Sequence, residues 1–115
     1  MTKQDLKDYR SILCEIAELE RLAKAQEEKQ AASVSPFASL VCERRIASYR
    51  RDLDELTAAR ERIERAVNAL PSLERRVIRL KYFEGLSWSD VAVRTCYSED
   101  YVRKSLCVSA FKKMF

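Results

Sequence analysis

One glycine and two prolines in 115 residues leave few positions at which this chain can turn sharply. Hairpin-linked strands and phosphate-wrapping loops both rely on glycine and proline for their unusual backbone angles. A multistranded fold and a nucleotide-cradling loop are therefore excluded. The composition favours long helices, and the length fits one small domain, alone or with an appendage.

The chain contains no histidine, which excludes a catalytic triad, imidazole acid–base chemistry and a histidine-based zinc site. No two of its four cysteines have the C-x-x-C spacing that is typical of metal ligands. The carboxylates alternate with basic residues, which is the pattern of solvated ion pairs on helix surfaces. We therefore expect no enzymatic activity, no catalytic residue, no metal site and no cofactor.

The first half of the chain begins with a predicted amphipathic helix over residues 3–30. Its apolar residues recur every three or four positions from Leu6 to Ala23, and no glycine or proline interrupts them. Residues 31–38 are predicted to break the helix, because the residue before Pro36 is disfavoured in helical conformation. Such a short connection favours two antiparallel neighbouring helices.

A second long helix is predicted over residues 39–69. Its apolar residues follow a heptad pattern from Ile46 to Leu70, with Arg60 as the one polar member. A seam of this kind needs a partner helix, and the first helix is the obvious candidate. The sequence thus predicts an antiparallel helical hairpin with a coiled-coil-like seam, in which Arg60 either extends outward or pairs with an acid such as Glu20.

We place a domain boundary at Pro71, which divides the chain into a helical hairpin (1–70) and a C-terminal module (71–115). The hairpin alone has a limited core, so it needs cover from the C-terminal module or from a second copy; a homodimer through the hairpin is one expectation. Residues 1–70 hold 13 basic and 13 acidic residues, whereas residues 71–115 hold 9 basic and 5 acidic ones. The net charge of +4 therefore belongs to the C-terminal module, which favours nucleic-acid binding there.

Residues 72–83 are predicted to form the first helix of the C-terminal module, with Ser72 as its N-cap. The only glycine, Gly85, follows at the position where a left-handed residue ends a helix. Ser87 is then predicted to cap a helix over residues 87–95.

A tight turn at Cys96-Tyr97 is predicted to lead into the last helix, which Ser98 caps. Val102 and Leu106 are its inward-facing residues. A supporting helix, a helix, a short turn and a second helix make up the helix-turn-helix layout. The overall fold prediction is an all-α protein: a long antiparallel hairpin followed by a helix-turn-helix module.

The C-terminal pattern resembles region four of bacterial sigma factors. The matching residues are Leu70-Pro71, Arg75, Arg76, Tyr82, Glu84-Gly85-Leu86-Ser87, Val91-Ala92, Ser98, Val102 and Arg103. The whole chain also resembles a narrower group, the small phage and prophage regulators of Gram-positive bacteria that place a long helical hairpin before such a module. This resemblance implies regulation or activation of phage genes, with RNA polymerase as a further partner.

The outward face of the last helix is the predicted contact with double-stranded DNA. With Val102 directed inward, helical geometry places its neighbours on the opposite side, toward the major groove. Basic side chains on this face can bond guanine edges or phosphates, and an acidic side chain can accept from the cytosine amino group. An arginine on the preceding helix can reach a phosphate. The predicted DNA-binding residues are Arg94, Asp100, Tyr101, Arg103 and Lys104.

The functional prediction is a sequence-specific DNA-binding transcriptional regulator. The alternative is an interaction module that docks on RNA polymerase or another factor without specific DNA binding, and the acidic residues Glu99 and Asp100 favour that alternative. No apolar segment approaches the ~20 residues of a membrane span, so we expect a cytoplasmic, nucleoid-associated protein. Apolar residues on the outward side of the last helix are expected either to dock on the hairpin or to form a dimer contact: Cys107, Val108, Phe111 and Met114.

Overall fold

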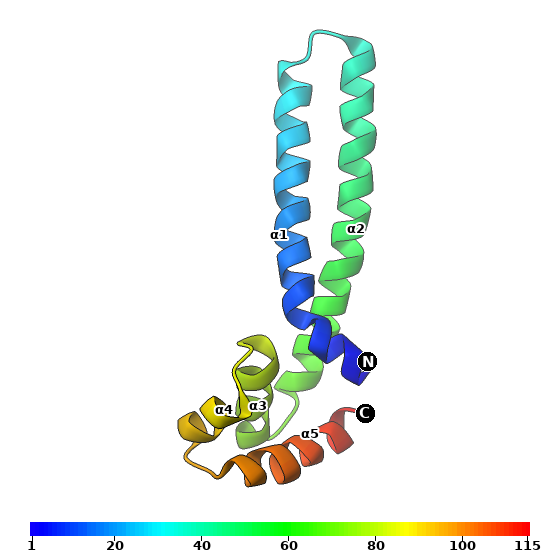
Figure 1. Cartoon of the computed structure of the whole chain (residues 1–115). Coiled ribbons are helices and arrows are strands. Elements are labelled where there is room, and N and C mark those ends of the chain that lie inside the picture. The colour runs from blue at the N-terminus through cyan, green and yellow to red at the C-terminus, as the bar shows by residue number, and fades with distance from the viewer. The chain divides into compact units, whose positions relative to one another are not determined.

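The computed structural model describes all 115 residues, and its architecture is all-α (Figure 1). As predicted, a long antiparallel helical hairpin is followed by a helix-turn-helix module. No helix is long and apolar enough to cross a membrane. The elements in order are α1 (Lys3–Ala32), α2 (Pro36–Asn68), α3 (Ser72–Ile78), the π-helical η1 (Arg79–Phe83), α4 (Trp88–Thr95), the π-helical η2 (Tyr101–Leu106) and α5 (Cys107–Met114).

The chain forms two compact units. One, here called the hairpin unit, is Ser11–Ala59; the other, the C-terminal unit, combines Met1–Arg10 with Arg60–Phe115. The limits of the compact units lie between residues 10 and 11 and between residues 59 and 60. The domain boundary placed at Pro71, with a helical hairpin in residues 1–70 and a helix-turn-helix module in residues 71–115, stays a prediction.

The hairpin unit has a narrow core along the facing sides of α1 and α2. Its buried residues recur at helical spacing on each helix, and one of them, Gln26, is polar. On the surface, Arg50 pairs with Glu27 across the two helices at 2.8 Å. The buried apolar residues are Ile16, Ala23, Cys42 and Ile46.

The turn of the hairpin is shorter than predicted, with only residues 33–35 outside the helices. Pro36 is the first residue of α2, a position that suits proline because the first helical N–H has no partner within the helix. Ser35 then starts the helix: its carbonyl accepts from Ser39 N at 3.0 Å, and its hydroxyl accepts from Ala38 N at 3.5 Å. The proline thus begins the second helix instead of interrupting the chain for several residues.

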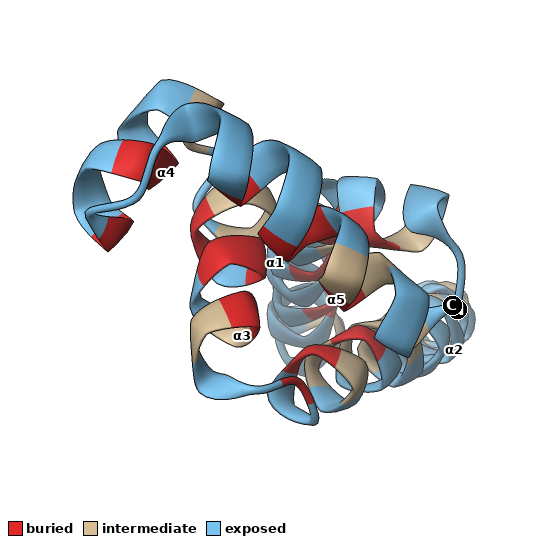
Figure 2. Ribbon diagram, turned by 90° about the horizontal axis from the view of Figure 1, so that it is seen from below, coloured by how far each residue is buried: buried red, intermediate tan, exposed pale blue.

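The C-terminal unit contains the tightly packed core. Figure 2 shows buried residues on the sides of α3, α4 and α5 that face one another. One cluster joins the supporting helix to the helix-turn-helix through Val77, Leu80, Val91, Val102 and Leu106. The predicted inward residues Val102 and Leu106 are confirmed as buried.

The first ten residues of the chain, which include the start of α1, belong to this C-terminal unit. Leu6 is fully buried, and the Tyr9 ring stacks on Phe83 with ring centroids 3.9 Å apart. The Tyr9 hydroxyl donates to Glu64 at 2.5 Å. Burial, together with this hydrogen bond, raises the pKa of Tyr9 to about 12. The apolar residues of α1 were predicted to form one seam, but they are divided between the core of the C-terminal unit and the core of the hairpin unit.

Ser72 does not cap α3, contrary to the prediction. Pro71 occupies the N-cap position, no side chain caps the helix, and Ser72 is its first helical residue. The helix then widens into η1, where Glu84 N donates to Arg79 O, five residues back. Gly85 ends it with a φ of 73°, as predicted. The Arg10 side chain lies against Gly85, so a larger residue there would have to displace it.

A buried carboxylate ties α5 to α3. Glu74 accepts hydrogen bonds from Ser109 Oγ at 2.7 Å and from Lys113 Nζ at 2.9 Å. Burial alone would raise the pKa of Glu74, but these hydrogen bonds and the lysine charge outweigh it and lower the pKa below its usual value of 4.5. The C-terminal helix is therefore held in place by an ionised group.

The apolar residues expected on the outward side of α5 are not all outward. Cys107 is buried, and burial raises the pKa of its thiol. The Phe111 ring lies 6.0 Å from that of Tyr82, and Lys3 Nζ lies 4.8 Å from its centroid. The contact of Phe111 with Lys3 agrees with the expected docking on residues 1–70, whereas Val108 remains exposed.

Arg60, the one polar member of the predicted seam, does not pair with Glu20. Its Nε lies 3.9 Å from Glu64 Oε1, one turn along the same helix. This Nε is buried and donates no hydrogen bond. The carboxylate that pairs with Arg60 therefore lies on α2 itself and not on the first helix.

Candidate nucleic-acid interface

The helix-turn-helix is built from α4, a turn at Cys96 and the last helix. Ser87 caps α4 as predicted, with its Oγ accepting from Asp90 N at 3.2 Å. Cys96 ends α4 in the left-handed conformation, at a φ of 62°. A residue with a side chain adopts this conformation at a cost of roughly 1–2 kcal/mol. The turn is therefore set by the surrounding packing and not by a glycine.

The second helix of the motif also starts as predicted. Ser98 Oγ accepts from Tyr101 N at 3.2 Å, and Ser98 O accepts from Val102 N at 3.0 Å. Its central segment, η2, is a π-helix that ends with the Cys107 N–H bonded to Val102 O. The prediction assumed a regular α-helix throughout, so the spacing of side chains along this segment differs from the expected one.

The predicted DNA-facing residues of this helix lie on its exposed side. Val102 is fully buried, whereas the four predicted residues around it are all exposed. Arg94 on α4 is exposed as well and lies 3.5 Å from Glu84. The structure thus presents all five side chains to the surroundings, and their contact with DNA stays a prediction. The four on the last helix are Asp100, Tyr101, Arg103 and Lys104.

Asp100 pairs with both bases of this exposed face. Its Oδ1 lies 3.6 Å from Arg103 Nη2 and 3.8 Å from Lys104 Nζ. Exposed pairs of this kind contribute about 0–1 kcal/mol each and weaken with salt. Arg103 and Lys104 can therefore bind an incoming anion, but this anion must first replace the carboxylate of Asp100.

Tyr97 joins this surface, although the sequence analysis placed it only in the turn. Its ring lies 5.2 Å from that of Tyr101, and both side chains are exposed. The sequence contains no periodic signal for this pair, because Tyr97 precedes the helix that Ser98 caps. An aromatic pair thus flanks the bases of the last helix.

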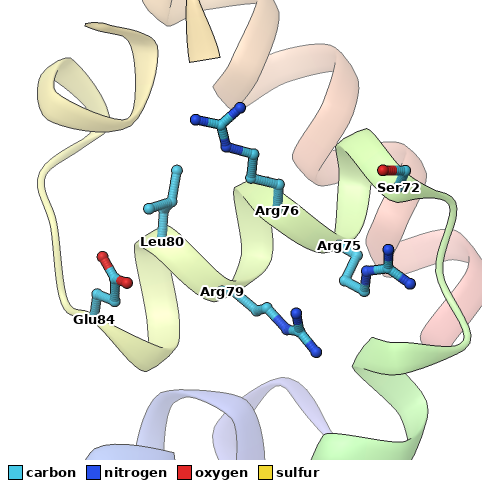
Figure 3. Close-up of a pocket in the computed structure, with 6 residues that line it drawn as sticks. All are labelled: Ser72, Arg75, Arg76, Arg79, Leu80 and Glu84. Atoms are coloured by element: carbon cyan, nitrogen blue, oxygen red, sulfur yellow. The ribbon is translucent and has the colours of Figure 1, made fainter. Parts of the chain in front are cut away.

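A pocket of about 390 Å³ lies on α3 and η1 (Figure 3). Its lining contains three arginines and one acid, none of them predicted as site residues. The sequence shows arginines at positions 75, 76 and 79, but nothing in it indicates that they border a hollow. The lining residues are Ser72, Arg75, Arg76, Arg79, Leu80 and Glu84.

Comparison with known proteins gives one match. Residues 60–107, less than half of the chain, match the family model described as sigma-70, region 4. No curated protein and no solved structure is significantly similar to the chain. The match supports the region-four resemblance and a regulatory role through DNA binding in general, and the matched domain is a DNA-binding one, not a catalytic one. The C-terminal part of this protein is thus a sigma-region-four-like helix-turn-helix domain.

Proposed function

We propose that this protein is a sequence-specific DNA-binding transcriptional regulator that activates phage or prophage genes in a Gram-positive host. The observation that carries the proposal is the sigma-70 region 4 match over a helix-turn-helix whose last helix turns a charged face outward. In this proposal the protein acts as an activator or as a partial sigma-like subunit.

Each predicted contact residue has a role in this proposal. Arg103 and Lys104 bond guanine edges or phosphates, and Asp100 accepts from a cytosine amino group. Tyr101 contacts a phosphate or a thymine methyl group, and Arg94 on α4 holds a phosphate. The exposed positions of all five side chains support these roles.

The partners follow from the same family likeness. Region 4 domains of sigma factors bind DNA and RNA polymerase, so RNA polymerase is the second partner in this proposal. Residues 71–115 act as the DNA-binding module, and the hairpin of residues 1–70 joins two copies into a homodimer. The place of action is the nucleoid of the bacterial host cell.

Selection of bound duplexes from a random DNA library, run beside light scattering, tests this proposal. We expect one enriched motif, and a palindromic motif together with a dimer mass would fix a two-fold arrangement. Recovery of no motif at moderate salt would contradict sequence-specific binding.

The Arg103→Ala/Lys104→Ala variant then tests the contact face. We expect its specific affinity to fall by about tenfold or more, since each base contact is worth roughly 1–3 kcal/mol. The matched control is Arg44→Ala/Arg51→Ala, which removes the same charge from exposed residues of α2 that have no ion pair. An equal loss in both variants would show that only net charge matters and that the assigned face is wrong.

The second candidate function is an interaction module that docks on RNA polymerase or another factor without reading DNA. The acidic start of the last helix favours it, because Asp100 already neutralises part of the charge of Arg103 and Lys104. Binding to phosphates falls steeply with salt, because neutralised phosphates release counterions. Salt-insensitive binding to polymerase, with no retention of duplex DNA, would favour this second function.

A further inference from the structure

The pocket on α3 and η1 carries unneutralised positive charge. Three arginines line it, and no carboxylate of the chain lies within ion-pair distance of any of their guanidinium groups. The one acid in the lining, Glu84, pairs instead with Arg94 at 3.5 Å. These three arginines can therefore bind an external anion without first breaking an ion pair, and they border a hollow instead of a flat surface.

Two of the three guanidinium groups are already held in place. Arg76 Nη2 donates to the carbonyl of Arg94 at 2.9 Å, and Arg79 Nη2 donates to Asn68 Oδ1. Arg75 is half-buried, and its guanidinium group makes no hydrogen bond within the chain. A fork that is fixed before binding loses less side-chain entropy when it binds a carboxylate or a phosphate.

The arginine pair Arg75 and Arg79 faces away from the predicted DNA contact. Both lie two residues from Val77, so helical geometry puts them roughly on the opposite side of the helix from it. Val77 packs in one cluster with Val102, which points inward from η2. Figure 3 shows Arg75 and Arg79 extending to one side of the helix, and Arg76 and Leu80 to the other. A duplex on the outward face of η2 is therefore directed away from this pair.

We infer that this pocket docks an acidic segment of a partner protein, with Asp or Glu side chains on the arginine forks. Charge complementarity supports the choice, because arginine forks bind carboxylates in a bidentate manner. The spread of the arginines along the helix suits several carboxylates on an extended segment. The inference is independent of DNA binding, so the protein has one face for DNA and another for an acidic partner.

A peptide-binding experiment on the full chain tests this inference. The probe is a fluorescein-labelled peptide rich in Asp and Glu residues, and the control peptide carries Asn and Gln at the same positions. We expect anisotropy to show binding of the acidic peptide alone, and Arg75→Gln/Arg79→Gln to weaken it by about tenfold or more, equivalent to about 1.4 kcal/mol. Arg44→Gln/Arg51→Gln, with the same change in charge, should weaken it by much less.

Four outcomes would contradict the inference. Equal weakening in the two double variants, or no binding by the wild type, would overturn it. So would a peptide affinity that falls as strongly in Arg103→Gln/Lys104→Gln, because the peptide would then sit on the η2 face. If Arg75→Gln/Arg79→Gln lowers duplex affinity and its salt dependence more than the α2 control does, the pocket belongs to the DNA interface and the inference is wrong.

The folded state of each variant is checked by circular dichroism and thermal unfolding. Should the double variant unfold, Arg79→Lys replaces it, since lysine keeps the charge and loses the planar fork. We then expect weaker peptide binding at an unchanged net charge. Unchanged peptide affinity in this folded variant would also contradict the inference.

Discussion

The two compact units differ in how completely they bury their apolar residues. Every large side chain that is fully buried lies in the C-terminal unit, namely Leu6, Ile63, Val67, Val77, Ile78, Val91 and Val102. The hairpin unit keeps large apolar residues exposed at its turn, including Val34 and Phe37, and elsewhere along its helices. Two long helices can share only one seam, whereas short helices crossing one another enclose a core. The comparison teaches that the complete burial of large side chains is confined to the unit that contains the helix-turn-helix.

The largest expected loss of stability comes from a substitution at Leu6, the residue of α1 that is fully buried in the C-terminal unit. Leu6→Ala should destabilise the protein by about 2–5 kcal/mol, because it leaves a cavity at a fully buried site. The matched control is Leu22→Ala in the hairpin unit, where the side chain is 40% exposed and should matter much less. Urea unfolding of both variants measures the difference. Equal losses would refute the contrast between the two units.

The next effect concerns the ionised group that holds α5. Glu74→Gln should cost about 1–3 kcal/mol near neutral pH, because the hydrogen bonds from Ser109 and Lys113 lose their charged acceptor. The pKa of Glu74 is lowered in the folded state. Its contribution is thus complete above the ordinary pKa of 4.5 and is lost as the pH falls through the folded pKa.

Thermal unfolding of wild type and Glu74→Gln across a pH series measures this contribution. The gap between their stabilities should be widest at neutral pH and should narrow as the medium is acidified below about 4.5. A gap that stays constant with pH would show that the hydrogen-bond geometry and not the charge holds α5. A gap that widens in acid would contradict the sign of the pKa shift.

The smallest effect is a gain in the hairpin unit. Gln26 is buried in its core, and its Oε1 accepts no hydrogen bond. Gln26→Leu should therefore stabilise the hairpin by about 1 kcal/mol, since it removes an unsatisfied polar atom. Urea unfolding measures the gain, with the exposed Gln4→Leu as the control. A loss of stability would mean that the amide is satisfied, and light scattering of the variant would show whether a second copy satisfies it.

Much of the fold follows from local signals in the sequence. Apolar spacing predicted both long helices, and Ser87, Ser98 and Gly85 were predicted at the ends where they lie. These features depend on contacts within a few residues, which the sequence displays directly. The sigma region 4 resemblance likewise depends on short-range motifs and agrees with the match over residues 60–107.

Other features did not follow from the spacing of residues. Ser72 was predicted as the cap of its helix, but its neighbour Pro71 occupies that place. Apolar spacing contains no signal for the wider helical turns at η1 and η2. The pocket arginines are present in the sequence, but only the fold shows that they border a hollow without a carboxylate partner.

The sequence by itself thus determined the all-α class, the positions of most helix ends and the buried side of the last helix. The tertiary structure alone decided which core each residue joins. Leu6 and Tyr9 continue the spacing of the hairpin helix, yet they belong to the C-terminal unit, where Leu6 is fully buried and the Tyr9 ring stacks on Phe83. The physical reason is that periodicity fixes which side of a helix is apolar, whereas the element that covers this side depends on where the rest of the chain lies in space.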